Sequence, residues 1–323
     1  MKNIIEVRKL SKYFQIRTNK NVFTGFFNPA YKEVKAVNDI SLTITKGEAV
    51  AFLGPNGAGK TTTTKMLTGL MYPTKGSVKV LGYIPFDKKR EFLQRIGLVM
   101  GNKAGLNWDL TANQSFWLNK NIYKINDKIF DQRVILMSQL MDVDTLLDTQ
   151  VRRLSLGERM KLELIGALLH NPEVLFLDEP TIGLDIIAKK NIRRFLKDIQ
   201  NEFKTTIILT SHDMDDIEQV CQRVIIINKG EKVYDDSLTA LTSQYEKTRY
   251  VRFIFDTQPQ ENKIAALKTG KIVEKTNDYY LFEVESSKLI ELITKVASQF
   301  KLIDLQVESV PLEEIIEHVF SAQ

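Results

Sequence analysis

The sequence is poor in cysteine, with Cys221 as the one cysteine among 323 residues. An intramolecular disulfide needs two cysteines, so none can form, and a cysteine-based metal cage is excluded as well. Long apolar runs are also missing, because no stretch approaches the roughly 18 residues that span a bilayer. Residues 1–15 lack the apolar core of a signal peptide. We therefore expect a soluble chain that works in a reducing compartment.

Tracts of one charge sign are absent too. The 45 Lys and Arg and 40 Asp and Glu give a formal net charge of +5 and are interspersed. An ordinary solvated surface is therefore favoured over a nucleic-acid-binding tract. Residues 245–323 hold 10 basic and 13 acidic residues, a net −3, which leaves 35 basic and 27 acidic residues, a net +8, in residues 1–244. This basic excess is compatible with phosphate ligands or anionic lipid headgroups, and the sign alone does not choose between them.

Length and composition indicate two folded domains. The chain is longer than one domain of about 100 to 200 residues, and its 43% hydrophobic and 26% charged residues are typical of globular proteins. Near the start, two β-rich runs, residues 4–10 and 36–44, flank an expected exposed loop at residues 17–35. Residues 48–53 then predict a strand, and residues 61–70 predict a helix.

The middle of the chain is predicted to be mostly helical. Helical spacing runs through residues 112–123, 129–141 and 161–170. Three short apolar runs then have the composition of buried parallel strands, and a predicted helix at residues 188–201 follows the first of them. These runs are residues 174–177, 206–209 and 223–227. The first domain is therefore predicted to be α/β.

The pattern changes after about residue 243. The expected order there is strand, helix, strand, strand, helix, strand, at residues 250–255, 262–267, 271–275, 279–284, 288–300 and 302–307. This order is compatible with a small α+β ferredoxin-like domain. A last helix is expected from Pro311, since proline is favoured in the first helical turn.

A glycine-rich segment lies between the predicted strand at residues 48–53 and the predicted helix after it. It reads Gly54-Pro55-Asn56-Gly57-Ala58-Gly59-Lys60-Thr61-Thr62 and fits the phosphate-binding loop pattern. The glycines let backbone N–H groups turn towards phosphates, and the helix N-terminus adds partial positive charge. Lys60 supplies a positive charge, and Thr61 offers a hydroxyl to Mg²⁺. A plain glycine turn is the less favoured interpretation.

Two carboxylates, Asp178 and Glu179, follow the apolar run at residues 174–177. Acidic residues after a strand are often helix caps. Beside a phosphate-binding loop they indicate a nucleotide site, in which Asp178 binds Mg²⁺ and Glu179 polarises an attacking water. These two motifs occur in many P-loop proteins, so they predict nucleotide binding without indicating the family.

A third motif indicates the family. Leu154-Ser155-Leu156-Gly157-Glu158, with Pro180, Gly183-Leu184-Asp185 and Ser211-His212 in the same order, resembles the ABC ATPase family over roughly residues 4–241. The resemblance implies a P-loop NTPase domain over residues 1–243 with a mainly helical subdomain at about residues 103–170. It leaves residues 244–323 as a C-terminal accessory or regulatory domain.

The resemblance also implies that two subunits share each ATP. Glu179 would be the general base, and His212 would contact the γ-phosphate and position the water. Five residues of one subunit would contact the ATP that the other subunit's phosphate loop binds. These residues are Ser155, Leu156, Gly157, Glu158 and Asp185.

Two further site residues follow from the resemblance. In Leu10-Ser11-Lys12-Tyr13-Phe14, the register favours Phe14 over Tyr13 as the ring that stacks on adenine, with a core role for Phe14 as the alternative. Asn102 stands where the family has a glutamine that reaches Mg²⁺ and faces the membrane subunit. Asparagine is shorter by one methylene, so its amide would lie roughly 1.5 Å back unless the backbone advances or a water intervenes.

The resemblance predicts an ATPase that powers a separate membrane permease, as a homodimer or with a close paralogue, at the cytoplasmic face of the plasma membrane. ATP and Mg²⁺ are the expected ligands. The segment from Asn102 to Leu110, with the motifs above, resembles an ABC-2-type exporter subgroup. An importer ATPase remains an alternative function within the transporter class. A soluble ABC protein acting on ribosomes or nucleic acid is disfavoured, because the chain has neither a second ATPase unit nor zinc-binding cysteines.

Overall fold

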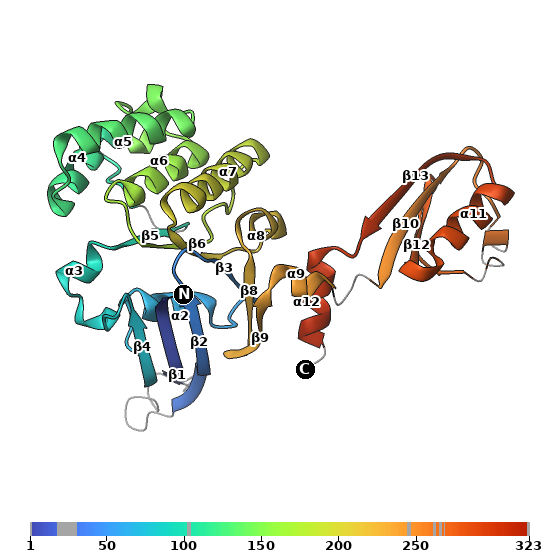
Figure 1. Ribbon diagram of the computed structural model, residues 1–323, viewed down its shortest axis with the longest axis horizontal. Helices are drawn as coiled ribbons and strands as arrows, with labels where there is room; N and C mark the ends of the chain where they lie inside the picture. Colours follow the sequence, from blue (N-terminus) through green and yellow to red (C-terminus); the bar gives the residue numbers. More distant parts are fainter. Residues whose placement is uncertain are drawn as a thin grey trace, which may run out of the picture. The chain divides into compact units, whose positions relative to one another are not determined.

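The computed structural model describes residues 2–17, 31–101, 105–243, 247–260, 263–264, 267 and 269–321. These residues form two compact units, Met1–Asp236 and Ser237–Gln323 (Figure 1). Across the described ranges, no helix has the length and apolar character needed to cross a membrane. The expected assignment of an ATPase domain to residues 1–243 and an accessory domain to residues 244–323 remains a prediction.

A six-stranded sheet forms the centre of the first unit. Its order is β5-β6-β7-β3-β8-β9, and the pairs from β5 to β8 are parallel. All five residues of β3, β6 and β7 are buried, which explains their continuous apolar runs. The strands are β3 (Ala49–Leu53), β5 (Ile96–Met100), β6 (Val174–Asp178), β7 (Thr206–Thr210), β8 (Arg223–Asn228) and β9 (Glu231–Ser237). The predicted parallel α/β sheet is confirmed.

A second, antiparallel sheet packs on the first through one helix. Its order is β2-β1-β4, with β1 at Asn3–Arg17, β2 at Tyr31–Thr45 and β4 at Lys75–Val80. Helix α2 (Lys60–Leu67) contacts both sheets and lies between them in Figure 1. Buried residues of both sheets and of α2 form one hydrophobic cluster. The phosphate loop is thus anchored at both ends in one core.

Helices cover the other side of the central sheet. Helix α6 contacts β5, α4, α5 and α7, and α7 contacts α8 (Figure 1). Local caps fix the helix starts: Thr111 and Ser155 form capping boxes, and Asn126 and Asp185 accept backbone hydrogen bonds. The helices are α3 (Arg90–Leu93), α4 (Ala112–Tyr123), α5 (Asp127–Leu140), α6 (Leu156–Leu168), α7 (Ile186–Phe203) and α8 (Met214–Val220). Short 3-10 turns lie at Pro85–Asp87, Asp144–Leu146 and Val151–Arg153.

The expected loop at residues 17–35 is wrong at both ends. Strand β1 reaches Arg17, and β2 begins at Tyr31; the rest of that segment lies outside the described residues. The outer part of this hairpin is solvent-exposed on β2, so it lacks the apolar alternation that marks a half-buried strand. The predicted helix at residues 61–70 ends at Leu67, because Gly69 follows with a φ of 75°.

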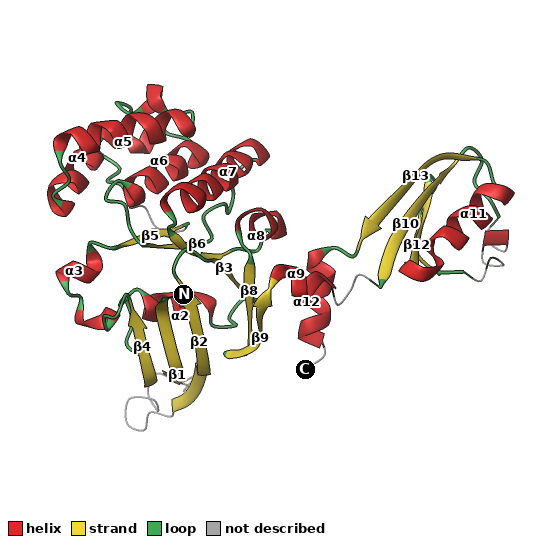
Figure 2. Ribbon diagram, viewed as in Figure 1, coloured by secondary structure: helices red, strands yellow, loops and turns green. Residues whose placement is uncertain are grey.

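The second unit contains a four-stranded antiparallel sheet of order β11-β12-β10-β13. This order is that of a ferredoxin-like sheet, and helix α11 contacts β12 and joins it to β13 (Figure 2). The predicted helix at residues 262–267 lies largely outside the described residues. The elements are α9 (Leu238–Ser243), β10 (Thr248–Phe255), β11 (Lys271–Lys275), β12 (Tyr279–Glu285), a 3-10 turn (Ser286–Lys288), α11 (Leu289–Gln299), β13 (Leu302–Ser309) and α12 (Leu312–Ser321). Its separate hydrophobic cluster includes Val251, Phe253, Tyr280 and Phe282.

Candidate active site

The phosphate loop occupies the turn between β3 and α2. Two of its glycines have no room for a side chain. A Cβ on Gly54, at φ 150°, would lie 2.1 Å from the Ile227 carbonyl oxygen, and one on Gly59, at φ 110°, would lie 2.4 Å from the Ala36 carbonyl oxygen. Neighbouring backbone therefore fixes the path of the loop, and only glycine satisfies both the left-handed conformation and the close approach.

Lys60 begins α2 and is only 6% exposed. Its Nζ donates hydrogen bonds to the carbonyl oxygens of Gly54, at 2.6 Å, and Pro55, at 3.2 Å. Burial lowers the pKa of Lys60, while the carboxylates of Glu179 and Asp178 act in the opposite direction. A cation is thus held among backbone carbonyls inside the phosphate loop.

Asp178 ends β6 directly beside Thr61. The Thr61 hydroxyl donates to Asp178 Oδ1 at 3.1 Å, and the Thr210 hydroxyl, from β7, donates to the same oxygen at 2.6 Å. A hydroxyl and a carboxylate at this separation fit Mg²⁺, which binds few protein oxygens and shares phosphate oxygens and water. Among the residues described, no group of three His, Cys, Asp or Glu converges to hold a metal ion. The Thr61 hydroxyl and the Asp178 carboxylate therefore form a donor set that fits a Mg²⁺ ion bound together with a nucleotide.

Glu179 has a φ of 57°, an uncommon value for a residue with a side chain. Its backbone N–H donates to the carbonyl oxygen of Thr210, at 3.0 Å, and to the Thr210 hydroxyl, at 3.1 Å. Its Oε1 lies 3.2 Å from His212 Nε2. Burial raises the pKa of Glu179, and His212 and Lys60 partly oppose that shift. The strained backbone aims a basic carboxylate at His212.

A cavity of about 340 Å³ connects these side chains. It is lined by Asn56, Gly57, Ala58, Gly59, Lys60, Thr61, Thr62, Glu179, Ile182 and His212. The structure thus brings most of the sequence-predicted loop residues together with the predicted base and its histidine. Gly54, Pro55 and Asp178 adjoin the lining through the hydrogen bonds to Lys60 and Thr61. The arrangement can bind a polyphosphate and deprotonate a water beside it.

The predicted trans-acting residues lie outside this cavity's lining and close to one another. Ser155 Oγ accepts a hydrogen bond from the Glu158 N–H at 3.3 Å, and the Glu158 carboxylate accepts from the Ser155 N–H at 2.8 Å. A Cβ on Gly157 would lie 3.1 Å from Ala188 Cβ and 3.8 Å from Asp185 Oδ2, so the N-termini of α6 and α7 are neighbours. Leu156, which lies between Ser155 and Gly157 in the sequence, is 38% exposed.

Two predicted site residues are not brought into the cavity. Phe14 lies partly buried on β1, opposite Val34, and is not among the residues that line the cavity. Asn102 lies outside the described residues.

Thr210, by contrast, is a site residue that the sequence analysis did not predict. Its hydroxyl contacts both Asp178 and Glu179, and its position at the end of an apolar run, two residues before His212, is the only signal for it in the sequence.

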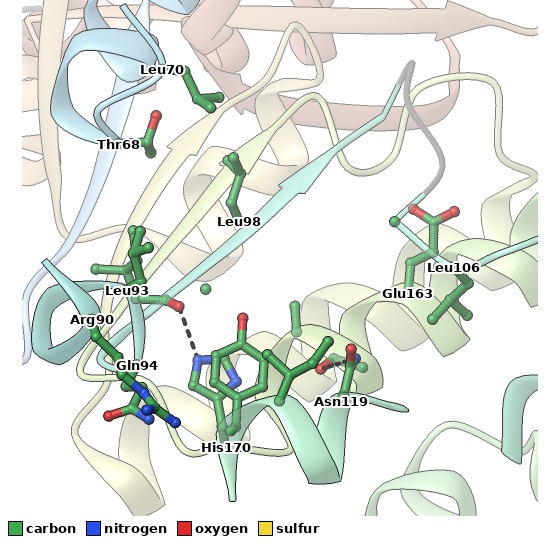
Figure 3. A pocket seen from close by; sticks show the side chains of 17 residues that line it. Thr68, Leu70, Arg90, Leu93, Gln94, Leu98, Leu106, Asn119, Glu163 and His170 are labelled. Carbon is green, nitrogen blue, oxygen red and sulfur yellow. Dashed lines mark hydrogen bonds between the residues drawn. The ribbon is translucent and has the colours of Figure 1, made fainter. Parts of the chain in front are cut away.

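A second cavity, of about 580 Å³, lies between β5, α3, α4 and α6 and contains none of the predicted site residues (Figure 3). Its walls are mainly apolar. His170 hydrogen-bonds the Ile96 carbonyl oxygen at 2.9 Å and stacks on Tyr123, with ring centroids 3.9 Å apart. Glu163 lines the opposite part, and burial raises the pKa of its carboxyl. The larger cavity is therefore a recess between the helical part and β5, and no residue of the phosphate loop lines it.

The chain is similar to a known protein family and to several known proteins. Residues 37–182 match the family model described as "ABC transporter". The chain is 34% identical to the bacitracin transport ATP-binding protein BcrA of Bacillus licheniformis, over 86% of this chain and 87% of that protein. It is 28% identical to the Nod factor export ATP-binding protein I of Rhizobium leguminosarum bv. viciae, over 83% of this chain and 85% of that protein.

A solved structure shows the same fold. The cbiO1 protein of Clostridium perfringens, part of the ABC transporter complex cbiONQ, aligns with a TM-score of 0.62 and 25% identity, over 76% of this chain and 92% of that one. The 34% identity to BcrA over most of the length of both chains shows the family. The chain belongs to the ABC transporter ATP-binding protein family and is an ATPase.

Proposed function

We propose that this ATPase drives an exporter of the ABC-2 type, working as a dimer on a separate membrane permease at the cytoplasmic face of the plasma membrane. The observation that carries the proposal is the cavity that Lys60, Glu179 and His212 line together, with Glu179 Oε1 3.2 Å from His212 Nε2. The names of the Nod factor export and bacitracin transport relatives support a transporter of this class.

Residues of one chain bind the ATP phosphates and activate the water. Residues 54–62 wrap the phosphates with backbone N–H groups, and Lys60 places its charge on them. Thr61 and Asp178 would hold Mg²⁺, with Asn102 as a further proposed ligand; when bound, Mg²⁺ neutralises phosphate charge. Glu179 accepts the proton of the attacking water, and His212 positions that water against the γ-phosphate. Phe14 is proposed to stack on adenine.

A second chain completes each site. Ser155, Leu156, Gly157, Glu158 and Asp185 lie together but outside the cavity of their own chain, which supports a role in the partner subunit's site. The N-terminus of α6 offers free backbone N–H groups and partial positive charge to a phosphate. The Ser155 hydroxyl also donates to Glu158 at 2.8 Å, so it must exchange this bond for one to the γ-phosphate.

We place the permease contact on the helical subdomain at about residues 103–170. The 580 Å³ recess lined by α4 and α6 supports this placement, because a concave, mainly apolar surface accepts an inserted segment of a partner.

The ferredoxin-like unit is proposed to brace or regulate the dimer, since its hydrophobic cluster is separate from the ATPase core. Closure on ATP and opening after hydrolysis would transmit force through these contacts.

Reconstitution tests the proposal. The chain is purified from its native host membranes in mild detergent with the permease that accompanies it, and the complex is placed in vesicles with the ATPase facing outwards. An exporter then moves cargo into the vesicle when ATP is added outside, and the Glu179→Gln variant does not. Release of preloaded cargo would identify an importer. Recovery of the chain with ribosomes and without a membrane protein would overturn the transporter assignment.

A further inference from the structure

A buried carboxylate outside the ATP cavity connects the segments that carry Glu179 and His212. Asp216, on α8, is 1% exposed and does not line the cavity. Its Oδ2 accepts hydrogen bonds from the hydroxyls of Thr181 and, at 2.7 Å, Ser211. Thr181 follows Glu179 by two residues, and Ser211 directly precedes His212. One oxygen atom therefore joins the two loops whose side chains meet at 3.2 Å in the cavity.

A buried arginine holds Asp216 from the other side. Arg193 lies on α7 with a side chain 8% exposed, and its Nε donates to Asp216 Oδ1 at 2.6 Å. The remaining guanidinium nitrogens bind Asp213, at 2.8 Å, and Asp215, at 3.0 Å. A guanidinium with all three nitrogens engaged fixes the α8 carboxylates in one orientation. Both oxygens of Asp216 are thereby satisfied, which a buried carboxylate requires.

The same arginine connects this cluster to the segment proposed to contact the second subunit. Helix α7 begins with Asp185 as its N-cap, and Lys189 of that helix donates to Asp213 Oδ2 at 2.7 Å. Asp213 in turn caps α8 directly after His212. A shift of the α7 N-terminus is therefore carried by hydrogen-bonded contacts to the residues that flank Glu179 and His212.

We propose that Asp216, held by Arg193, is a positioning residue that sets the distance between Glu179 and His212. The inference rests on the proposed roles of those two residues. Asp216 touches neither ATP nor the water in this account; it acts through Thr181 and Ser211. Displacing either loop by about 1 Å separates base and histidine and costs turnover on the order of 10²-fold, while the phosphate loop that binds ATP is unaffected.

Steady-state kinetics of the purified full chain tests this. Asp216→Asn keeps the shape but removes the charge that Arg193 holds, and it leaves one acceptor oxygen for three donors, which are Arg193 Nε and the hydroxyls of Thr181 and Ser211. We expect kcat to fall by about 10- to 100-fold, with the KM for ATP within about twofold of wild type. Asp215→Asn is the matched control, because it removes the same charge from the same guanidinium without touching Thr181 or Ser211; it should change kcat by less than about twofold.

If Asp216→Asn does not fold, a second pair of variants tests the positioning role of Asp216. Thr181→Val replaces the hydroxyl by a methyl group and should lower kcat, whereas Thr181→Ser keeps the hydroxyl and should restore it. A folded Asp216→Asn chain with the kcat of Asp215→Asn, or Thr181→Val equal to Thr181→Ser, would overturn the inference. Glu179→Gln run in parallel separates the two failures: if it retains turnover, the proposed role of Glu179 falls, and if it alone is inactive, only the role of Asp216 falls.

Discussion

Glu179 directly follows the buried strand β6 and carries the carboxylate that we propose as the base. Glu179 leaves the strand with a φ of 57°, and its backbone N–H donates to both the carbonyl oxygen and the hydroxyl of Thr210. These contacts compensate the cost of the left-handed conformation, which for a residue with a side chain is of order 1 kcal/mol or more. The backbone therefore fixes where the carboxylate points before ATP binds.

The first prediction concerns the role of Glu179 as base. Glu179→Gln keeps size and polarity but accepts no proton at neutral pH, so ATP binding should persist while turnover falls by about 10²-fold or more. Nucleotide binding is measured by equilibrium dialysis and turnover by phosphate release. Near-normal turnover by a folded, dimeric variant would remove Glu179 from the role.

The raised pKa of Glu179 also predicts a stability effect. Burial favours the protonated carboxyl in the folded chain, so Glu179 lowers the free energy of unfolding as pH rises above the unfolded value of about 4.3, and the loss is complete above its raised folded pKa. Without nucleotide, Glu179→Gln should therefore melt at a higher temperature than wild type at pH 7, and this advantage should shrink towards pH 5. A variant that melts lower at pH 7 would contradict the direction of the shift.

At the scale of elements, the site depends on two neighbouring strand ends. Strands β6 and β7 are in register from Val174 and Thr206 to Asp178 and Thr210, which places the Thr210 hydroxyl beside both carboxylate-bearing residues. The pairing of β6 and β7 therefore sets the separation of Asp178, Glu179 and Thr210. A rigid sheet edge is a precise support for such a site.

Thr210→Val tests this dependence. The substitution preserves the shape of the side chain in β7 and removes the hydroxyl, so the chain should fold with a loss of about 1 to 3 kcal/mol and require more Mg²⁺ for half-maximal turnover. Thr206→Val is the matched control at the other end of β7, where the hydroxyl accepts a hydrogen bond from the Gly47 N–H. Its stability loss should be similar and its Mg²⁺ requirement unchanged. Equal Mg²⁺ requirements in the two variants would contradict the assignment.

Elements with strong local signals were predictable from sequence. Residues 112–123 form the expected helix with the same bounds, because Thr111 caps its start and Lys124 ends it in the left-handed conformation. Strand β4 was missed because residues 75–80 are largely polar and exposed, and α8 was missed because it has only seven residues. The loop and the carboxylates were recognised from short contiguous motifs. Thr210, Asp216 and Arg193 act through contacts between segments far apart in the chain, which no local pattern reveals.

The whole molecule consists of two units with separate hydrophobic cores. The cluster around Phe52 and Ile225 and the cluster around Phe253 and Phe282 have no residue in common. Strand β9, which ends at Ser237, closes one edge of the central sheet. The first unit therefore has the complete sheet, phosphate loop and carboxylates without the second.

A chain truncated after Ser237 should accordingly stay folded and bind ATP. We expect its thermal unfolding transition to remain cooperative, as for an independent domain, and its dimer affinity or transport activity to fall if the second unit braces the dimer. Calorimetry and sedimentation velocity measure the two properties. Loss of the cooperative transition would show that the ATPase core needs the second unit.

The central claim is that two chains complete each ATP site. Wild-type chain is mixed at constant total concentration with a Lys60→Ala/Ser155→Arg double variant, and ATP turnover is measured after subunit exchange. Every mixed dimer pairs an intact phosphate loop with an altered Ser155 segment, and an altered loop with an intact one, so both of its sites fail. With random exchange at equal amounts, about one dimer in four is fully wild type, and turnover should fall to about a quarter. A fall to one half, in linear proportion to the wild-type fraction, would show that single chains hydrolyse ATP and would contradict the account.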